Sequence, residues 1–152
     1  MDRIDKRILA HLQEDSNESV ADIAHSVGLS TTPCWRRIQK LERAGVVRKR
    51  VALLDRHEIN LGVDVFVAIK TNQHNAKWLA GFTAVVEDLP EVVEFYRMSG
   101  DIDYLMRVVV QDISAFDKFY KRLIERVQLS DVSSSFAMEQ IKYTTALPLD
   151  HA

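Results

Sequence analysis

The chain has 152 residues, with 20 lysines and arginines against 22 aspartates and glutamates, and a formal net charge of −2. With 47% apolar and 28% charged residues, this composition is typical of a globular protein and excludes a disordered chain. No apolar run approaches the roughly 18–20 residues of a membrane-spanning helix, and the N-terminus does not resemble a signal peptide. The one cysteine, Cys34, cannot form an internal disulfide. We therefore expect a cytoplasmic protein with no membrane partner.

The first 45 residues carry three helical patterns. Apolar residues recur at helical spacing over residues 3–14, after a favourable N-cap residue. Ser19 is expected to cap a second helix that ends at Gly28, because glycine readily adopts the left-handed conformation that often follows a helix. Ser30 is expected to cap a third helix, with Pro33 in its first turn. The second and third helices have the lengths and the short connection of a helix-turn-helix.

The third helix has one apolar face and one basic face. Between Ser30 and Arg50 lie seven basic side chains and one acidic one, Glu42. A solvated helix face is the usual interpretation of a charge run, but helical periodicity here separates the basic positions from the packing positions, which favours a DNA-reading helix. The residues expected to face bases are Thr32, Arg36, Gln39 and Lys40. Those expected to lie nearer phosphates are Arg37, Arg43, Arg48 and Lys49.

The segment that follows the third helix is basic and rich in β-forming residues. Val46–Leu53 is expected to form a short strand or hairpin, a wing beside the DNA-binding helix. Residues 1–53 are thus predicted to form a winged helix-turn-helix domain. The mostly polar residues 54–62 are predicted to be a linker.

Residues 63–152 change in pattern and are predicted to form a second domain. Four strands are expected, at Val63–Ile69, Val92–Met98, Tyr104–Val110 and Val132–Thr144. Helical patterns fall after the first and third of them, the second capped by Asp112 or Ser114. The order βαββαβ is that of a ferredoxin-like α+β fold with both helices on one face of an antiparallel sheet. Its other face needs cover, which predicts a homodimer.

Two segments carry a family resemblance. The segment Leu29–Val47 resembles the signature of the leucine-responsive/asparagine regulator (Lrp/AsnC) family, and Ser99–Tyr104 resembles the glycine-plus-acidic hairpin of its amino-acid-sensing domain. The resemblance implies a transcriptional regulator that binds double-stranded DNA, with dimers that often form octamers. It also implies a small-molecule effector, usually an amino acid, bound between dimers. Residues 129–145 and 103–108 are similar to a branch that includes cysteine-responsive activators.

The hairpin supplies groups that could hold a free amino acid. Gly100 allows close backbone approach, Asp101 or Asp103 could take the ammonium, Tyr104 could line a side-chain pocket, and Ser134 could contribute from the last strand. From the residues alone, a Gly-Asp pattern more often simply closes a turn. The family resemblance favours the effector site.

Other chemistry has little support in the sequence. The glycines form no dinucleotide or phosphate motif, and no histidine or cysteine pair has metal-ligand spacing, so we expect no cofactor and no metal site. Cys34 lies on the apolar face of its helix and is expected to be buried and inert. Two alternatives stay open: an enzyme similar to siroheme decarboxylases on the same two-domain plan, and a chromosome-organising DNA-binding protein. The intact basic helix argues against the enzyme.

Overall fold

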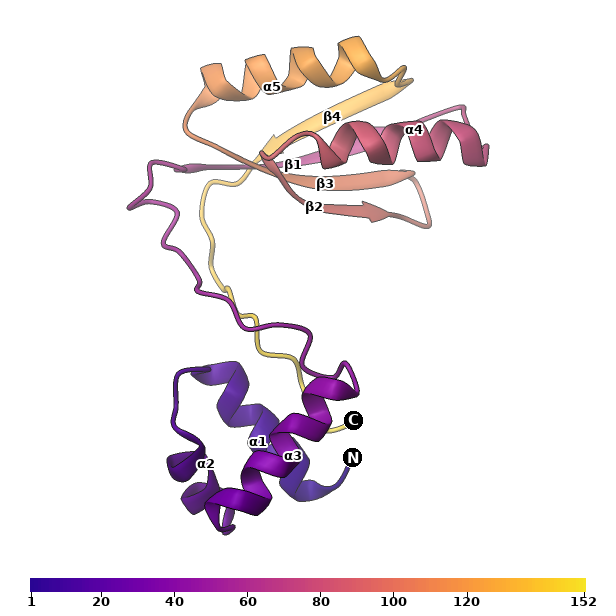
Figure 1. Ribbon diagram of the computed structural model, residues 1–152. Helices are drawn as coiled ribbons and strands as arrows, with labels where there is room; N and C mark the ends of the chain where they lie inside the picture. The colour runs from indigo at the N-terminus through magenta and orange to yellow at the C-terminus, as the bar shows by residue number, and fades with distance from the viewer. The chain divides into compact units, whose positions relative to one another are not determined.

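The computed structural model describes residues 1–152, which divide into two compact units. The helical unit contains Met1–Leu53 together with Ile141–Ala152, and the sheet unit contains Leu54–Gln140. Both ends of the chain therefore lie in the helical unit (Figure 1). The predicted second domain runs to residue 152, whereas in the structure the last segment belongs to the helical unit because Leu149 packs against its core. No helix is both long and apolar enough to span a membrane.

Three helices build the helical unit: α1 (Arg3–Glu14), α2 (Val20–Val27) and α3 (Thr31–Arg43). The predicted bounds of α1 and α2 and the predicted start of α3 are confirmed, and Ser19 caps α2 by accepting from the Asp22 N–H. The helices bury one apolar cluster, which consists of Ile8, Leu9, Ile23, Ala24, Val27, Cys34, Ile38 and Leu41.

The connection between α2 and α3 is short and depends on glycine. Gly28 ends α2 in the left-handed conformation, with φ of 76°, as the sequence predicts. The next N–H, that of Leu29, donates to the carbonyl of Ala24 over 2.8 Å and closes the last turn of α2. Ser30 then begins α3 in extended backbone, without a side-chain capping bond. This tight turn sets α3 against α2 in a helix-turn-helix.

The predicted wing strand does not form within this chain. Val46–Leu53 contains no strand, and the side chains of Val46, Val51 and Leu53 are exposed. A strand requires a neighbouring strand for its backbone hydrogen bonds, and no segment of this chain pairs with these residues. The basic residues here, Arg48, Lys49 and Arg50, are therefore carried on an irregular, exposed segment.

The sheet unit contains β1 (Val63–Lys70), α4 (Ala76–Glu87), β2 (Val92–Arg97), β3 (Tyr104–Val110), α5 (Ile113–Arg126) and β4 (Asp131–Phe136). All strand pairs are antiparallel, in the order β2-β3-β1-β4. Both helices cover the same face of the sheet (Figure 1). The predicted βαββαβ α+β fold is confirmed. Asp112, one of the two predicted caps, begins α5 by accepting from the Ala115 N–H.

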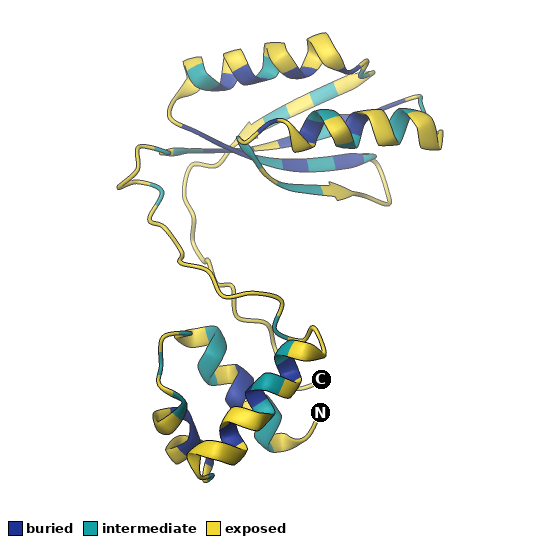
Figure 2. Cartoon of the chain, in the orientation of Figure 1, coloured by how far each residue is buried: buried dark blue, intermediate teal, exposed yellow.

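The strand register decides which side chains face the helices. Val65, Val67 and Ile69 of β1 are fully buried against α4 and α5, and their partners on β3 are Val108, Met106 and Tyr104. The buried sides of both helices therefore face the sheet, while their outer sides are exposed (Figure 2). Alternate residues, such as Phe66, point to the opposite face, which no element of this unit covers.

The last strand is shorter than predicted. The sequence pattern predicts a strand over Val132–Thr144, but β4 ends at Phe136. Its partner β1 begins at Val63, and the pairing ends where Val65 faces Phe136. One more backbone hydrogen bond follows, from the Ala137 N–H to the Asp64 carbonyl over 2.9 Å, close to the start of β1. Residues 137–149 form no regular element.

Candidate nucleic-acid interface and ligand hairpin

Five basic side chains on and just after α3 are exposed and have no acidic partner. They are Arg36, Lys40, Arg43, Arg48 and Lys49. None takes part in an ion pair or a side-chain hydrogen bond within the chain, and the predicted base-facing Thr32 is also exposed. Arg36, Lys40 and Arg43 lie on one side of α3, opposite the buried side formed by Cys34, Ile38 and Leu41. Unpaired positive charge on one helix face is an electrostatic footprint for a polyanion.

Two predicted contact residues have partners inside the helical unit. Arg37 Nη1 donates to the carboxylates of Asp2 and Asp5, each over 2.7 Å. The hydrogen bonds that Arg37 donates to these two aspartates raise its pKa. Gln39 Nε2 donates to Glu42 over 2.8 Å, and the other oxygen of Glu42 accepts from Arg50. Arg37 and Gln39 are therefore less free to contact DNA than the sequence pattern predicts.

Asp2 and Asp5 were not among the candidate residues, although a local signal marks them. Asp2 accepts from the N–H groups of Ile4 and Asp5, and its own N–H donates to the Asp5 carboxylate over 3.1 Å, which makes a capping box. The cap is visible in the sequence, but its third partner, Arg37, lies on another helix.

Cys34 is fully buried in the helical core, as predicted. Burial raises the pKa of its thiol, which disfavours the reactive thiolate. By contrast, the neighbouring Trp35 is about half exposed. It lies next to Arg36 on the accessible part of α3.

The loop between β2 and β3 turns at Gly100. Gly100 has φ of 123°, a conformation that other residues rarely adopt, and it is exposed. Asp103 fastens the end of the loop: its N–H donates to the Ile69 carbonyl, and its carboxylate accepts from the Thr71 N–H over 2.8 Å. Asp101 is largely exposed and pairs with Lys70 Nζ over 3.1 Å. The hairpin thus presents carboxylate groups at the end of β1.

Tyr104 and Ser134 lie on β3 and β4, with their side chains on the helix-facing side of the sheet. Tyr104 is 6% exposed and packs among Trp78, Phe82 and Phe95 beneath α4. It pairs with Ile69, whose side chain faces the helices, so Tyr104 belongs to the core of the sheet unit. Ser134 pairs with Val67 and shares that helix-facing side. Strand alternation, which depends on the register, directs both side chains toward the core.

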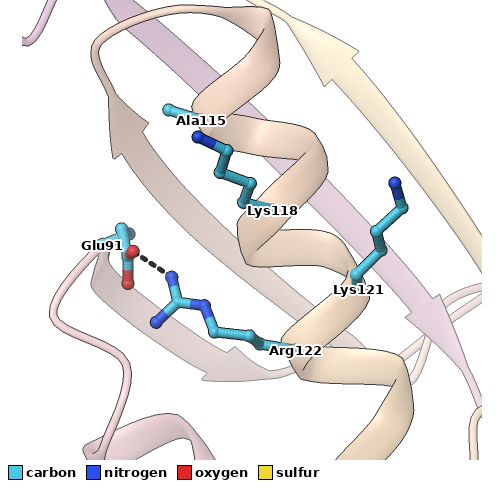
Figure 3. Close-up of a pocket in the computed structure, with 5 residues that line it drawn as sticks. All are labelled: Glu91, Ala115, Lys118, Lys121 and Arg122. Carbon is cyan, nitrogen blue, oxygen red and sulfur yellow. Dashed lines mark hydrogen bonds and ion pairs between the residues drawn. The ribbon is translucent and has the colours of Figure 1, made fainter.

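Two surface hollows in the sheet unit lie away from the hairpin. One, of about 450 Å³, is lined by His57, Asn60, Gly62 and Gln111. The other, of about 510 Å³, is lined by Glu91, Ala115, Lys118, Lys121 and Arg122, with Arg122 paired to Glu91 (Figure 3). Neither hollow includes a residue of the Gly100–Tyr104 hairpin. No group of three or more acidic, histidine or cysteine side chains is placed to hold a metal ion.

The uncovered sheet face combines an apolar patch with a buried ion network. Phe66, Ala68, Leu105 and Tyr96 alternate onto this face from three neighbouring strands. At one end of it, Asp64 is only 3% exposed and pairs with Arg107 over 2.9 Å and with Arg56 over 2.5 Å. Arg107 also pairs with Glu94 on β2. An uncovered sheet face of this kind is typical of a protein interface.

Family models match both units. Residues 1–42 match the AsnC-type helix-turn-helix domain, and residues 64–147 match the Lrp/AsnC ligand binding domain. The chain belongs to the Lrp/AsnC family. The resemblance stated from the Leu29–Val47 segment and the hairpin is therefore confirmed.

Full-length relatives of this Lrp/AsnC protein are transcriptional regulators. It is 52% identical to the DNA-binding transcriptional activator DecR of Escherichia coli K12, over 99% of both chains. It is 48% identical to the glutamate uptake regulatory protein of Zymomonas mobilis, over 98% of this chain and 91% of the relative. The chain is a DNA-binding transcriptional regulator and not an enzyme, so the siroheme-decarboxylase alternative is wrong.

Solved structures of the family agree in fold. The crystal structure of an AsnC family regulator from Agrobacterium tumefaciens matches with a TM-score of 0.96 and 65% identity, over 99% of this chain and 98% of that one. The regulator NMB0573 of Neisseria meningitidis, solved as a complex with L-Met, matches with a TM-score of 0.94 and 36% identity, over 99% and 98%.

Proposed function

We propose that α3 enters the major groove, with Arg36 and Lys40 reading bases and Arg43, Arg48 and Lys49 holding phosphates. The observation that carries this proposal is that these five basic side chains are exposed and unpaired. Thr32 lies on the same exposed side and joins the base-facing set. Gln39 and Arg37 also contact DNA, through the side-chain atoms that are not used in their hydrogen bonds to Glu42, Asp2 and Asp5. Base contacts specify the sequence, and phosphate contacts set the position of the helix.

The DNA-reading form is a homodimer. One α3 helix offers few contacts, and two helices about 34 Å apart read half-sites one turn apart with much greater affinity. The uncovered face with Phe66 and Leu105 is the surface that we assign to the dimer contact, because it is the apolar face that the sheet unit leaves without cover. Dimers assemble further, in line with the family, to an octamer. The protein acts in the cytoplasm, with its DNA.

The small-molecule effector is an amino acid held at the hairpin, at an interface between dimers. Gly100 lets the effector approach the backbone, and the carboxylates of Asp101 and Asp103 attract its ammonium group. A single chain does not enclose this hairpin in either of the hollows described, which supports a site completed by a second dimer. The L-Met complex of the Neisseria relative also supports an amino-acid ligand.

Two measurements test this function. Selection from a random pool of DNA duplexes should enrich a palindromic site that the protein binds at least about 10³-fold more tightly than unselected DNA. A thermal-shift screen of the twenty amino acids should give a rise in unfolding temperature for the effector, since a ligand that binds the folded state stabilises it. Equal affinity for all duplexes would instead favour the chromosome-organising alternative. Absence of a shift with every amino acid would overturn the effector class.

A further inference from the structure

The C-terminal tail, Ile141–Ala152, contacts the rest of the helical unit at three points. Leu149 is partly buried against the apolar cluster of the helical unit. The Leu147 N–H donates to Gln13 Oε1 over 2.7 Å, and Gln13 Nε2 donates to the Leu147 carbonyl over 3.2 Å. Lys6 Nζ donates to the Asp150 carbonyl over 3.2 Å. Chain ends are usually poorly ordered unless they are tied down, and this one is tied down by a side chain and by its backbone.

The geometry of these contacts fixes the register of the tail. The amide of Gln13 uses both its donor and its acceptor on the backbone of one residue, Leu147, as a neighbouring strand would. Lys6 and Gln13 are two helical turns apart and share one face of α1, so the tail follows this face. The side chain of Leu147 is 71% exposed, whereas that of Leu149 is partly buried. Of these two leucines, only Leu149 contributes an apolar contact that holds the tail on the helical unit.

The tail also joins the two units a second time. It follows β4, which pairs with β1 and begins where Asp131 lies opposite Lys70, the partner of Asp101. The chain thus passes between the units at Leu53–Leu54 and again at Gln140–Ile141. A unit held by two chain segments has fewer accessible orientations than a unit held by one, so less entropy is lost when it is held on DNA.

We propose that the docked tail is a clasp that limits the orientations of the helical unit and so strengthens binding to DNA with two half-sites. The inference rests on the proposed dimeric DNA-binding function. Once one recognition helix is bound, the affinity gained from the second depends on its effective concentration at the other half-site, which falls as the tether becomes looser. Release of the tail should therefore weaken binding to two half-sites and leave binding to one half-site unchanged.

The test compares two leucines of the tail in the full-length protein. Leu149→Asp places a charge against the apolar cluster and should release the tail, whereas Leu147→Asp changes an exposed side chain and is the matched control. Docking is measured by hydrogen exchange of the peptide that covers the tail. Affinity is measured on a selected duplex with two half-sites and on the same duplex with one half-site scrambled.

We expect Leu149→Asp to speed exchange of the tail at least about tenfold and to weaken binding to the two-site duplex about tenfold, with binding to the one-site duplex within about twofold of wild type. Leu147→Asp should match the wild type in all three measurements. Unchanged exchange in Leu149→Asp would overturn the docking. Faster exchange with equal losses on both duplexes, or with no loss, would overturn the clasp.

A milder pair of variants covers the case in which Leu149→Asp unfolds the helical unit. Gln13→Ala removes both hydrogen bonds to Leu147 and keeps good helix propensity, and the neighbouring exposed Glu14→Ala is its control. Gln13→Ala should show the same direction of change in exchange and in two-site binding, and an outcome like that of Glu14→Ala would contradict the clasp. If the wild type itself fails to prefer a selected duplex, the proposed function fails. The exchange rates decide separately whether the tail is docked.

Discussion

Arg37 Nη1 on α3 lies 2.7 Å from Oδ2 of Asp2, the residue that caps α1. The same nitrogen lies 2.7 Å from Asp5 Oδ1, so one guanidinium joins α3 to the first turn of α1. Asp5 is only 14% exposed, and removal of its partner would leave a carboxylate with little access to water. Arg37 is therefore a positioning residue for α3.

Replacement of Arg37 should affect stability more than the salt dependence of DNA binding. Arg37→Ala should lower the thermal unfolding midpoint of the protein by several degrees, because it breaks two charge-assisted hydrogen bonds. Arg43→Ala, on the exposed and unpaired side of α3, is the control: it should leave the midpoint unchanged and reduce the slope of log affinity against log salt by about one. The opposite assignment of these two effects would show that Arg37 is mainly a phosphate contact.

The ion pairs of Arg37 with Asp2 and Asp5 predict a loss of stability in acid. The backbone N–H of Asp5, followed by the Arg37 side chain, lowers the pKa of Asp2 from its ordinary value. A carboxylate with a lowered pKa in the folded state contributes stability above its unfolded pKa, about 4, and loses that contribution as the pH falls through the folded value. At pH values below 4, the thermal unfolding midpoint of the helical unit should decrease less steeply in Asp2→Asn than in the wild type, because asparagine does not titrate. Asparagine can still cap the helix. Identical pH profiles for the two proteins would contradict this.

Two basic residues should differ in how they change DNA selectivity. Arg36→Ala should cost about 1–3 kcal/mol on the selected duplex and relax the preference at one base position, because Arg36 is proposed to read a base. Lys49→Ala should weaken selected and unselected DNA alike, because it is proposed to hold a phosphate. Gel-shift titrations on both kinds of duplex over a range of salt concentrations measure the difference. Wild-type binding by both variants would exclude α3 as the recognition helix.

Asp103 accepts a hydrogen bond from the Thr71 N–H and is also proposed to bind the effector. Two substitutions separate these roles. Asp103→Ala leaves the buried Thr71 N–H without its acceptor and should destabilise the sheet unit by about 1–3 kcal/mol. Asp103→Asn keeps an oxygen for that N–H but removes the charge, so it should fold like the wild type and lose the thermal shift produced by the effector. A normal shift in Asp103→Asn would remove this carboxylate from the effector site.

The uncovered sheet face should decide the oligomeric state. Phe66 lies on this face and is 40% exposed. Phe66→Asp places a charge where a second copy is proposed to pack. We expect this variant to be mostly monomeric at micromolar concentration by light scattering, with the wild type a dimer or larger. Ile113→Asp, at an exposed apolar position at the start of α5, is the control and should assemble like the wild type. A wild-type monomer, or a fully assembled Phe66→Asp, would reject this interface.

Local patterns in the sequence were sufficient for most of the elements. The helices α1 and α2 begin at short-range caps, α3 begins at Ser30 without a side-chain cap, and α2 ends at Gly28. The signals for these bounds lie within a few residues of each helix end. The strands on either side of the Gly100 turn, β2 and β3, were predicted for the same reason. The predictions of a wing strand and of a long last strand were wrong, because a strand forms only where a second strand supplies its hydrogen bonds.

The amino-acid sequence by itself determined the two-domain plan, the basic face of α3 and the hairpin of acidic residues, because each depends on spacing along one segment. Only the tertiary structure decided which of these groups are free. Arg37 is held by Asp2, 35 residues away, and the register of β3 against β1 turns Tyr104 into the core. The return of the tail to Gln13 joins residues 134 positions apart. Contacts of this range depend on how whole elements pack, and no periodicity within a single segment records them.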